Sequence, residues 1–254
     1  MSGAGHFRLK TALFALAFAM ASAGEAFAGC EHSSSRDIEL SAGQHVGGGE
    51  HGFAPLALGP KEVVLTFDDG PNPDTTPLIL DTLRANCIAA TFFVIGPAAN
   101  SYPGLLRREL SEGHSIGGHT WNHEPLVEKP VVTAIADITR GFRPLSAVNA
   151  PANLFRFPGM ASSPALLDWL KRHGMAAVAA DIDAGTGSAA RPVLTLEAIK
   201  AQLRKKGRGI ILLKDSQANT VALLPSLIEF LQREGYTVRH LKGHDGRVVL
   251  SSQP

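Results

Sequence analysis

The chain has few cysteines, few aromatic residues and almost no net charge. Its 254 residues include only two cysteines, too few for a fold held together mainly by disulfides. Aromatic residues make up 6%, and 24 basic side chains against 23 acidic ones leave a formal net charge of +1. Because no block of Lys and Arg stands out that could neutralise a row of phosphates, we expect no nucleic-acid partner. With 44% hydrophobic residues, the composition is that of one globular domain.

An apolar run at the N-terminus is too short to cross a bilayer. It covers residues 11–23, it follows Arg8 and Lys10, and residues 26–28 (Ala-Phe-Ala) then supply the small-x-small pattern of a cleavage site. This order is typical of an export signal. We therefore predict that residues 1–28 are a signal peptide and that the protein is secreted or periplasmic.

Both cysteines, Cys30 and Cys87, follow that cleavage site. In an oxidising compartment they could pair with each other. Residues 27–30 (Phe-Ala-Gly-Cys) also resemble a bacterial lipobox, in which case Cys30 would carry a lipid anchor, the only membrane contact that we expect. The residues leave open a disulfide, a lipid anchor and two unpaired thiols.

The rest of the chain divides by its hydrophobic pattern. Residues 29–60 are rich in Ser, Gly and His without a sustained period, which predicts a flexible linker. Short apolar runs then alternate with helical patterns over 61–241, and 242–254 form a tail. We predict strands at 63–67, 90–95, 115–117, 154–157, 176–180, 210–213 and 238–241, and helices at 76–86, 103–112, 131–148, 164–172, 195–206 and 221–234. This alternation predicts a mainly parallel α/β domain, with its chemistry at the carboxyl ends of the strands.

Two adjacent carboxylates, Asp68 and Asp69, follow the first predicted strand. Side chains of successive residues at a strand end point in different directions, so one carboxylate can bind a cation while the other stays ionised as a base. The same residues, followed by Gly and Pro, would also suit an ordinary polar turn.

Two histidines, His119 and His123, follow the third predicted strand. Four residues apart on a helical turn, they would point the same way and could bind one Zn²⁺. No Glu follows the first His, which excludes the zinc-protease motif. Such a pair also occurs incidentally on polar surfaces, but its coincidence with the Asp pair favours a metal site.

Two further polar groups stand at strand ends. Arg156 leaves a strand into a tight turn, and Asp181 and Asp183 follow the next strand. An arginine can pair with a carboxylate, fix its orientation and lower its proton affinity, which makes Arg156 and Asp183 candidate catalytic residues. The alternative is an ordinary ion pair at a strand end.

Together these motifs resemble the signature of the polysaccharide deacetylases, which carry the NodB homology domain and form carbohydrate esterase family four. That family includes chitooligosaccharide, chitin, peptidoglycan and xylan deacetylases. The resemblance covers about residues 61 to 241 and implies a distorted (β/α) barrel with about seven strands. The blocks that carry it are Thr66-Phe67-Asp68-Asp69-Gly70-Pro71, His119-Thr120-Trp121-Asn122-His123, Arg156-Phe157-Pro158 and Leu212-Leu213-Lys214-Asp215-Ser216.

The resemblance also implies roles for these residues. Asp69, His119 and His123 would bind a divalent metal, usually zinc, or another such as Co²⁺. Asp68 would be the general base that activates water, and Arg156 would orient Asp68. The substrate would be an N-acetylated glycan, such as a chitooligosaccharide or peptidoglycan, and the reaction would remove its N-acetyl groups.

The resemblance also implies an oxyanion donor, and the sequence departs from the family's pattern at two positions. The backbone N–H of Gly159, after Pro158, would help to hold the oxyanion. Asp183 is followed by Ala-Gly-Thr-Gly at 184–187, so the family's usual Asp and Trp of the groove wall are missing. Lys214 stands where the family has the general-acid His. The resemblance thus implies a metal-dependent deacetylase or, alternatively, a catalytically weak or inactive member that binds glycan in the same groove.

One competing motif lies at residues 113–117. Gly-His-Ser-Ile-Gly matches the nucleophile elbow of serine hydrolases, in which the Ser sits between a strand and a long helix. Here a helical pattern precedes the motif and His119 follows almost at once. This context argues against an elbow and against serine-hydrolase chemistry at this motif.

Overall fold

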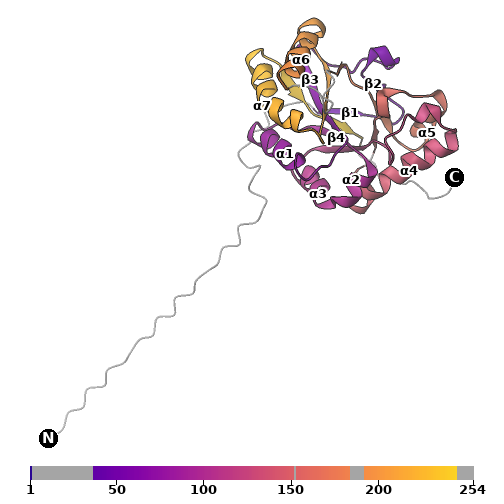
Figure 1. Cartoon of the computed structure of the whole chain (residues 1–254), viewed down its shortest axis with the longest axis horizontal. Helices are drawn as coiled ribbons and strands as arrows, with labels where there is room; N and C mark the ends of the chain where they lie inside the picture. The colour runs from indigo at the N-terminus through magenta and orange to yellow at the C-terminus, as the bar shows by residue number, and fades with distance from the viewer. Residues whose placement is uncertain (2–36, 152, 184–191, 245–254) are drawn as a thin grey trace. The chain divides into compact units, whose positions relative to one another are not determined.

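The computed structural model describes residue 1 and residues 37–151, 153–183 and 192–244. In this part the larger sheet has nine strands, in the order β2-β7-β6-β5-β4-β3-β9-β8, with β10 also paired to β3. Its pairings are parallel, and the helices lie around the outside of the strands (Figure 1). The predicted α/β fold of distorted-barrel type is confirmed, with nine strands in place of about seven.

The predicted strands are observed close to their predicted bounds, except that one of them is divided. Three further strands were not predicted. The strand predicted at 238–241 is divided in two by His240, and β1, β2 and β8 were not predicted. The observed strands are β1 (Ile38–Leu40), β2 (His45–Val46), β3 (Glu62–Asp68), β4 (Thr91–Val94), β5 (Ser115–Gly118), β6 (Leu154–Phe155), β7 (Ala176–Val178), β8 (Ile182–Asp183), β9 (Gly209–Lys214), β10 (Thr237–Arg239) and β11 (Leu241–Gly243).

All six predicted helices are present, and one short helix, α2, was missed. Their bounds are α1 (Thr76–Ala85), α2 (Gly96–Ser101), α3 (Pro103–Ser111), α4 (Val131–Ala147), α5 (Pro164–Arg172), α6 (Pro192–Lys206) and α7 (Ala218–Arg233). Within the described residues, the 3₁₀ helices are η2 (Gly49–His51), η3 (Leu126–Glu128) and η4 (Pro158–Met160).

Helix α5 shows why local sequence predicts such elements. The hydroxyl of Ser163 accepts a hydrogen bond from Leu166 N, and Pro164 occupies the first turn, where its missing N–H has no partner to lose. Two basic residues stand in the last turn, which favours that end electrostatically. Its buried face, which includes Trp169, packs into the main core.

The segment predicted as a flexible linker belongs in part to the fold. Of residues 29–60 the structure describes 37–60, and within these β1 pairs with β11 and β2 pairs with β7. Phe53, Leu56 and Leu58 are buried. The linker prediction is therefore wrong for 37–60, because a low density of apolar residues hid a few well-placed ones. The predicted signal peptide and most of the tail lie outside the described residues.

The structure bears on the state of one cysteine and on membrane-spanning helices. Cys87 is disulfide-bonded, and Cys30, the other cysteine of the chain, lies outside the described residues. In the described part of the chain, no helix combines the length and the apolar character that crossing a membrane requires.

Candidate metal centre and active site

The candidate residues meet at one edge of the sheet because their strands are parallel. Asp68 ends β3 and Lys214 ends β9, and the two are register partners on neighbouring strands. His119 directly follows β5, and Arg156 directly follows β6. The carboxyl ends of parallel strands lie on the same side, so residues nearly 150 positions apart in the chain become neighbours.

Asp69 lies at the centre of this group. Its backbone is left-handed (φ 70°), and its N–H donates to Phe93 O at 3.1 Å, so the turn after β3 is fixed to the end of β4. Its Oδ1 lies 3.4 Å from His119 Nε2 and 3.2 Å from His123 Nε2. One oxygen and two nitrogens thus lie within 4.8 Å of one another.

The chemistry of these three side chains fits a divalent metal. His119 Nδ1 is hydrogen-bonded to Arg156 O at 2.8 Å, which places the proton on Nδ1 and leaves the lone pair on Nε2. Asp69 Oδ1 and His119 Nε2 are buried and have no hydrogen-bond partner among the described residues. Buried polar atoms without partners are costly, and a cation between them would satisfy both. An O,N,N donor set is one that Zn²⁺ accepts.

The two histidines do not lie on a helical turn, which corrects the prediction from their spacing. Residues 119–123 form a loop in which Thr120 (φ 68°) and His123 (φ 54°) are left-handed. His123 N donates to the Thr120 hydroxyl at 3.0 Å, and the two imidazole rings are 4.8 Å apart between centroids. The loop still brings both imidazole rings to the same side, because the Nε2 atoms of His119 and His123 both lie close to Asp69 Oδ1.

Asp68 is held by Arg156, and both side chains are buried. Arg156 Nη1 donates to Asp68 Oδ1 at 2.7 Å and to the Thr66 hydroxyl at 2.9 Å, and Nε donates to Val178 O at 3.0 Å. The guanidinium also lies 4.2 Å from the centre of the Phe93 ring. A buried charge pair is tolerated only when its hydrogen bonds are satisfied, and the bonds from Arg156 meet that need. Thr66 and Phe93, at inward positions of two core strands, were not singled out in the sequence.

Lys214 approaches the other side of Asp69. Its Nζ lies 2.9 Å from Asp69 Oδ2 and 4.0 Å from Asp68 Oδ2. Burial alone would raise the pKa of Asp69, but His119, His123 and the charge of Lys214 outweigh it and hold this pKa well below its usual range. Asp69 is therefore ionised at any ordinary pH, as a metal ligand must be.

A second, fully buried carboxyl group lies directly behind the site. Asp215 accepts hydrogen bonds from the Thr76 hydroxyl at 2.8 and 2.9 Å, and a Cβ on Gly70 would lie 1.7 Å from its Oδ2, so only glycine fits there. Burial raises the pKa of Asp215 to about 7, with help from the charge of Asp69 and against the Thr76 bond. Asp215 belongs to the last sequence block, but nothing in the sequence indicated that its carboxyl group is buried behind the site with a raised pKa.

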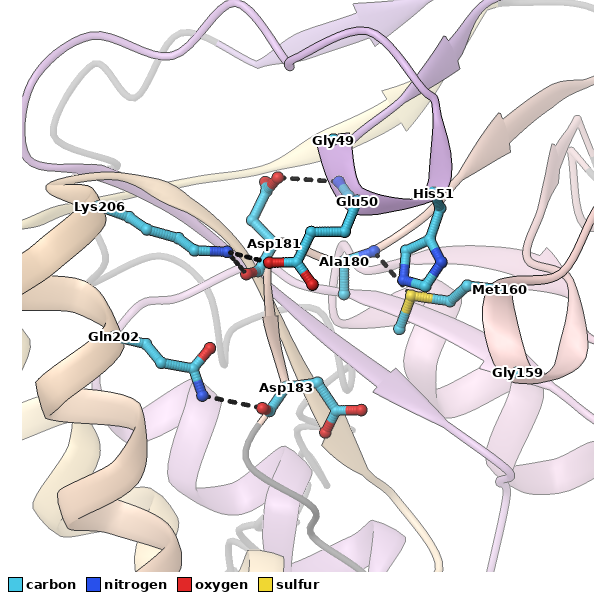
Figure 2. Close-up of a pocket in the computed structure, with 11 residues that line it drawn as sticks. Gly49, Glu50, His51, Gly159, Met160, Ala180, Asp181, Asp183, Gln202 and Lys206 are labelled. Atoms are coloured by element: carbon cyan, nitrogen blue, oxygen red, sulfur yellow. Dashed lines mark hydrogen bonds and ion pairs between the residues drawn. The ribbon is translucent and has the colours of Figure 1, made fainter.

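Gly159, Pro158 and Asp183 lie at a cavity of about 270 Å³ or next to it. Gly159, in η4, is left-handed (φ 61°) and borders the cavity, as does Asp183 at the end of β8. Figure 2 shows Glu50 of η2 opposite Lys206 of α6, with 3.8 Å between their charged atoms. Pro158 begins η4 and is buried.

Asp181, the other carboxylate that follows β7, binds backbone. Its carboxylate accepts from Gly48 N at 2.8 Å and from Ile210 N at 2.9 Å. It therefore fastens the segment before η2 to strand β9, and Arg156 pairs with Asp68.

A family model described as "Polysaccharide deacetylase" matches residues 57–178. A chitooligosaccharide deacetylase of Sinorhizobium fredii is 33% identical over 199 residues, which are 72% of this chain and 91% of that protein. A peptidoglycan-N-acetylglucosamine deacetylase of Listeria monocytogenes is 48% identical over 75 residues, 30% of this chain but only 16% of the relative's own length.

Two solved structures share the fold. A peptidoglycan deacetylase of Bdellovibrio bacteriovorus superposes with a TM-score of 0.74 at 26% identity, covering 85% of this chain and 63% of that one. The chitin deacetylase of Colletotrichum lindemuthianum gives a TM-score of 0.68 at 26% identity, covering 80% and 91%. Both similarities extend well beyond the 122 residues that the family model matches.

Proposed function

Because the chain belongs to the polysaccharide deacetylase family, we propose that it hydrolyses the N-acetyl groups of a glycan containing N-acetylglucosamine, with a divalent metal. Zinc fits the donor set, and Co²⁺ is an alternative. The observation that carries this proposal is the convergence of Asp69, His119 and His123 beside a carboxylate, Asp68, that an arginine holds in place.

The metal, when bound, would polarise the amide carbonyl and lower the pKa of water. Asp68 Oδ2, which is not the oxygen bound by Arg156, would accept the proton of the attacking water. Arg156 would hold the Asp68 carboxylate in a fixed orientation, with Oδ2 left to accept the proton.

Two groups would act on the tetrahedral intermediate and its collapse. The N–H of Gly159 would donate to the oxyanion, and the ammonium of Lys214 would supply the proton that the leaving amine needs. Lys214 is placed for this by its position at the end of β9, 4.0 Å from the base Asp68. The products would be acetate and a glycan with a free amino group.

The substrate class follows from the relatives, whose names specify chitooligosaccharides and peptidoglycan N-acetylglucosamine. Chitooligosaccharide is the better first choice, because that relative is matched over nearly its whole length. The cavity beside Gly159, lined by Glu50, Asp183 and Gln202, offers hydrogen-bonding groups to a neighbouring sugar.

The test measures acetate released from chitopentaose and, in parallel, from peptidoglycan. We expect release by protein reconstituted with Zn²⁺, loss of release with a chelator, and recovery when metal is restored. Asp68→Asn should keep the fold and the metal but lose at least about 10²-fold in rate. If Asp68→Asn were as active as the unchanged protein, Asp68 would not be the base. If neither glycan released acetate at any metal loading, the deacetylase proposal would fail.

We further propose that the protein is exported and cleaved after Ala28. The support is the basic, apolar and small-residue order of positions 8–28. N-terminal mass spectrometry of material from an envelope or culture fraction should find Gly29 first, or a lipid-modified Cys30 if the lipobox is used. An intact Met1 in protein recovered from the cytoplasm would contradict export.

A further inference from the structure

Far from the metal centre, a serine, a histidine and an aspartate lie in a row. The Ser115 hydroxyl is 2.9 Å from His240 Nε2, and His240 Nδ1 is 3.6 Å from Asp37 Oδ1. Nucleophile, base and orienting carboxylate thus follow one another in the order of a catalytic triad. The three residues come from the start of β5, the link between β10 and β11, and the segment before β1.

Backbone hydrogen bonds fix each of the three positions. Ser115 N donates to Ala90 O at 3.0 Å, and Ile38 N donates to His240 O at 2.8 Å, which keeps the neighbouring Asp37 beside the imidazole. The Thr91 hydroxyl donates to Leu241 O at 2.8 Å and holds the residue after His240 against β4. The arrangement therefore does not depend on flexible side chains alone.

Ser115, His240 and Asp37 border two surface cavities. Ser115 and His240 border a cavity of about 230 Å³, and His240 and Asp37 border a second one of about 430 Å³. Ser115 is half-buried, His240 is 5% exposed, and Lys242 lines both cavities. A reactive serine needs this combination of a shielded base and an accessible hydroxyl.

The row is separate from the deacetylase site. Ser115 is the first residue of β5, whereas His119 follows its last residue. At about 3.3 Å per residue, the two lie about 13 Å apart along the strand. The triad is at the amino end of the sheet and the metal ligands are at the carboxyl end.

We propose that Ser115 is a nucleophile that His240 and Asp37 activate towards esters of short carboxylic acids, a second reactivity of this chain. Ser115 Oγ would attack the ester carbonyl while His240 Nε2 takes the hydroxyl proton. The alkoxide or phenolate would leave with that proton, so that one C–O bond forms, one breaks and an acyl-serine remains. Water, deprotonated by His240, would then release the acid.

The protonation state of His240 suits this step. Burial, with Lys242 nearby, lowers the pKa of His240 to about 4, although the Asp37 carboxylate and a hydrogen bond to the Ala90 backbone act in the opposite direction. The imidazole is thus neutral at pH 7. Asp37 favours the tautomer with its proton on Nδ1, which leaves the Nε2 lone pair for the hydroxyl of Ser115. The other nearby charged or titratable groups are Lys242 and His114.

The geometry also predicts slow turnover. The N–H of Ser115 already donates to Ala90 O, so it cannot stabilise an oxyanion as the N–H of a nucleophilic serine often does. Acylation by an activated ester, whose phenolate leaves easily, should still be faster than hydrolysis of the acyl-serine, whose leaving group is the serine alkoxide, so the acyl-serine should accumulate. The sequence context argued against a nucleophile elbow and serine-hydrolase chemistry at 113–117. Ser115 indeed begins a strand and is no elbow, but its partners His240 and Asp37 come from distant segments, which local sequence could not show.

The experiment treats the full chain with p-nitrophenyl acetate in the presence of a metal chelator. We expect a burst of about one p-nitrophenolate per chain and, by peptide mass spectrometry, one acetyl group on Ser115. Ser115→Ala should abolish the burst. His240→Gln and Asp37→Asn should slow it, His240→Gln by about 10²-fold or more. Lowering the pH through 4 should suppress it, since His240 then becomes protonated.

Controls separate this reactivity from general damage and from the deacetylase. Ser111→Ala removes an exposed serine at the end of α3 and should leave the burst unchanged. His119→Ala should also leave it unchanged, while Ser115→Ala should retain acetate release from chitopentaose. Acetyl groups found on lysines but not on Ser115, or an equal burst from Ser115→Ala, would overturn the proposal. The mapping on unchanged protein decides the question even if a variant fails to fold.

Discussion

The two oxygens of Asp69 face different partners: Lys214 Nζ lies 2.9 Å from Oδ2, and the histidines lie 3.2 and 3.4 Å from Oδ1. A carboxylate held in this way presents a single oxygen to a metal. The ammonium also brings a positive charge close to the place where the cation would bind. Lys214 would therefore act on a metal bound by Asp69, besides standing where the resemblance implies a general acid.

The first prediction concerns metal content. Protein purified without chelator should hold about one Zn²⁺ per chain, and His119→Ala should lose most of it, because one of three protein ligands is gone. Elemental analysis by mass spectrometry measures this. His173→Ala, which removes a histidine stacked on Trp169, is the matched control and should keep its zinc. Equal zinc in His119→Ala and the unchanged protein would show that the metal binds elsewhere.

The second prediction concerns Lys214. Free lysine titrates near pH 10.4 and imidazole near 6.5, about the pH at which a general acid is most effective. Lys214→His should therefore raise acetate release at pH 7 by about 10-fold. Lys205→His, at an exposed position of α6, controls for adding a histidine and should change nothing. No gain in Lys214→His together with loss of activity in Lys214→Ala would instead identify Lys214 as an effective acid.

The third prediction concerns the buried pair of Asp68 and Arg156. Arg156→Met leaves the Asp68 carboxylate buried without its partner and should lower the free energy of unfolding by about 3–5 kcal/mol. Adding Asp68→Asn should restore part of that loss, since the unpaired charge is then gone. Urea denaturation measures both. Arg172→Met breaks an exposed pair with Asp168 and should change stability by less than about 1 kcal/mol.

The fourth prediction concerns His114 and acid. Burial, with His240 and Arg108 nearby, lowers the pKa of His114 to about 3, whereas an unfolded chain would bind that proton near pH 6.5. The unfolded state therefore takes up a proton first as pH falls, so the stability due to this group is complete above pH 6.5 and declines between 6.5 and 3. At pH 5 the loss should be about 2 kcal/mol.

The variant His114→Asn tests this assignment. Its amide oxygen can still accept from Ala90 N, as His114 Nδ1 does at 3.1 Å, but it does not titrate. Urea denaturation at pH 7 and pH 5 should show a smaller difference for His114→Asn than for the unchanged protein. His51→Asn, at an exposed position, should keep the full difference. The same pH dependence in His114→Asn would assign the loss to other groups.

Elements whose signals lie within a few neighbouring residues were predictable. The proline, serine cap and apolar spacing that make α5 are adjacent in the chain, and its predicted bounds match the observed ones. The carboxylates and histidines could be recognised because their blocks are compact and because strand ends collect chemistry. The short strands β1, β2 and β8 could not, since two or three residues carry no period and pair only because a sheet edge is already present.

The sequence by itself determined the order of the longer strands and helices, the candidate ligand set and the unusual lysine. Only the tertiary structure decided which atoms meet: that Arg156 Nη1 donates to Oδ1 of Asp68 and not to Oδ2, and that Ser115 reaches His240 across 125 positions. The physical reason is that spacing along a chain fixes local geometry, whereas contacts between distant residues follow from strand register and packing. A shift of one residue in the register of β5, for example, would turn the Ser115 side chain to the other face of the sheet.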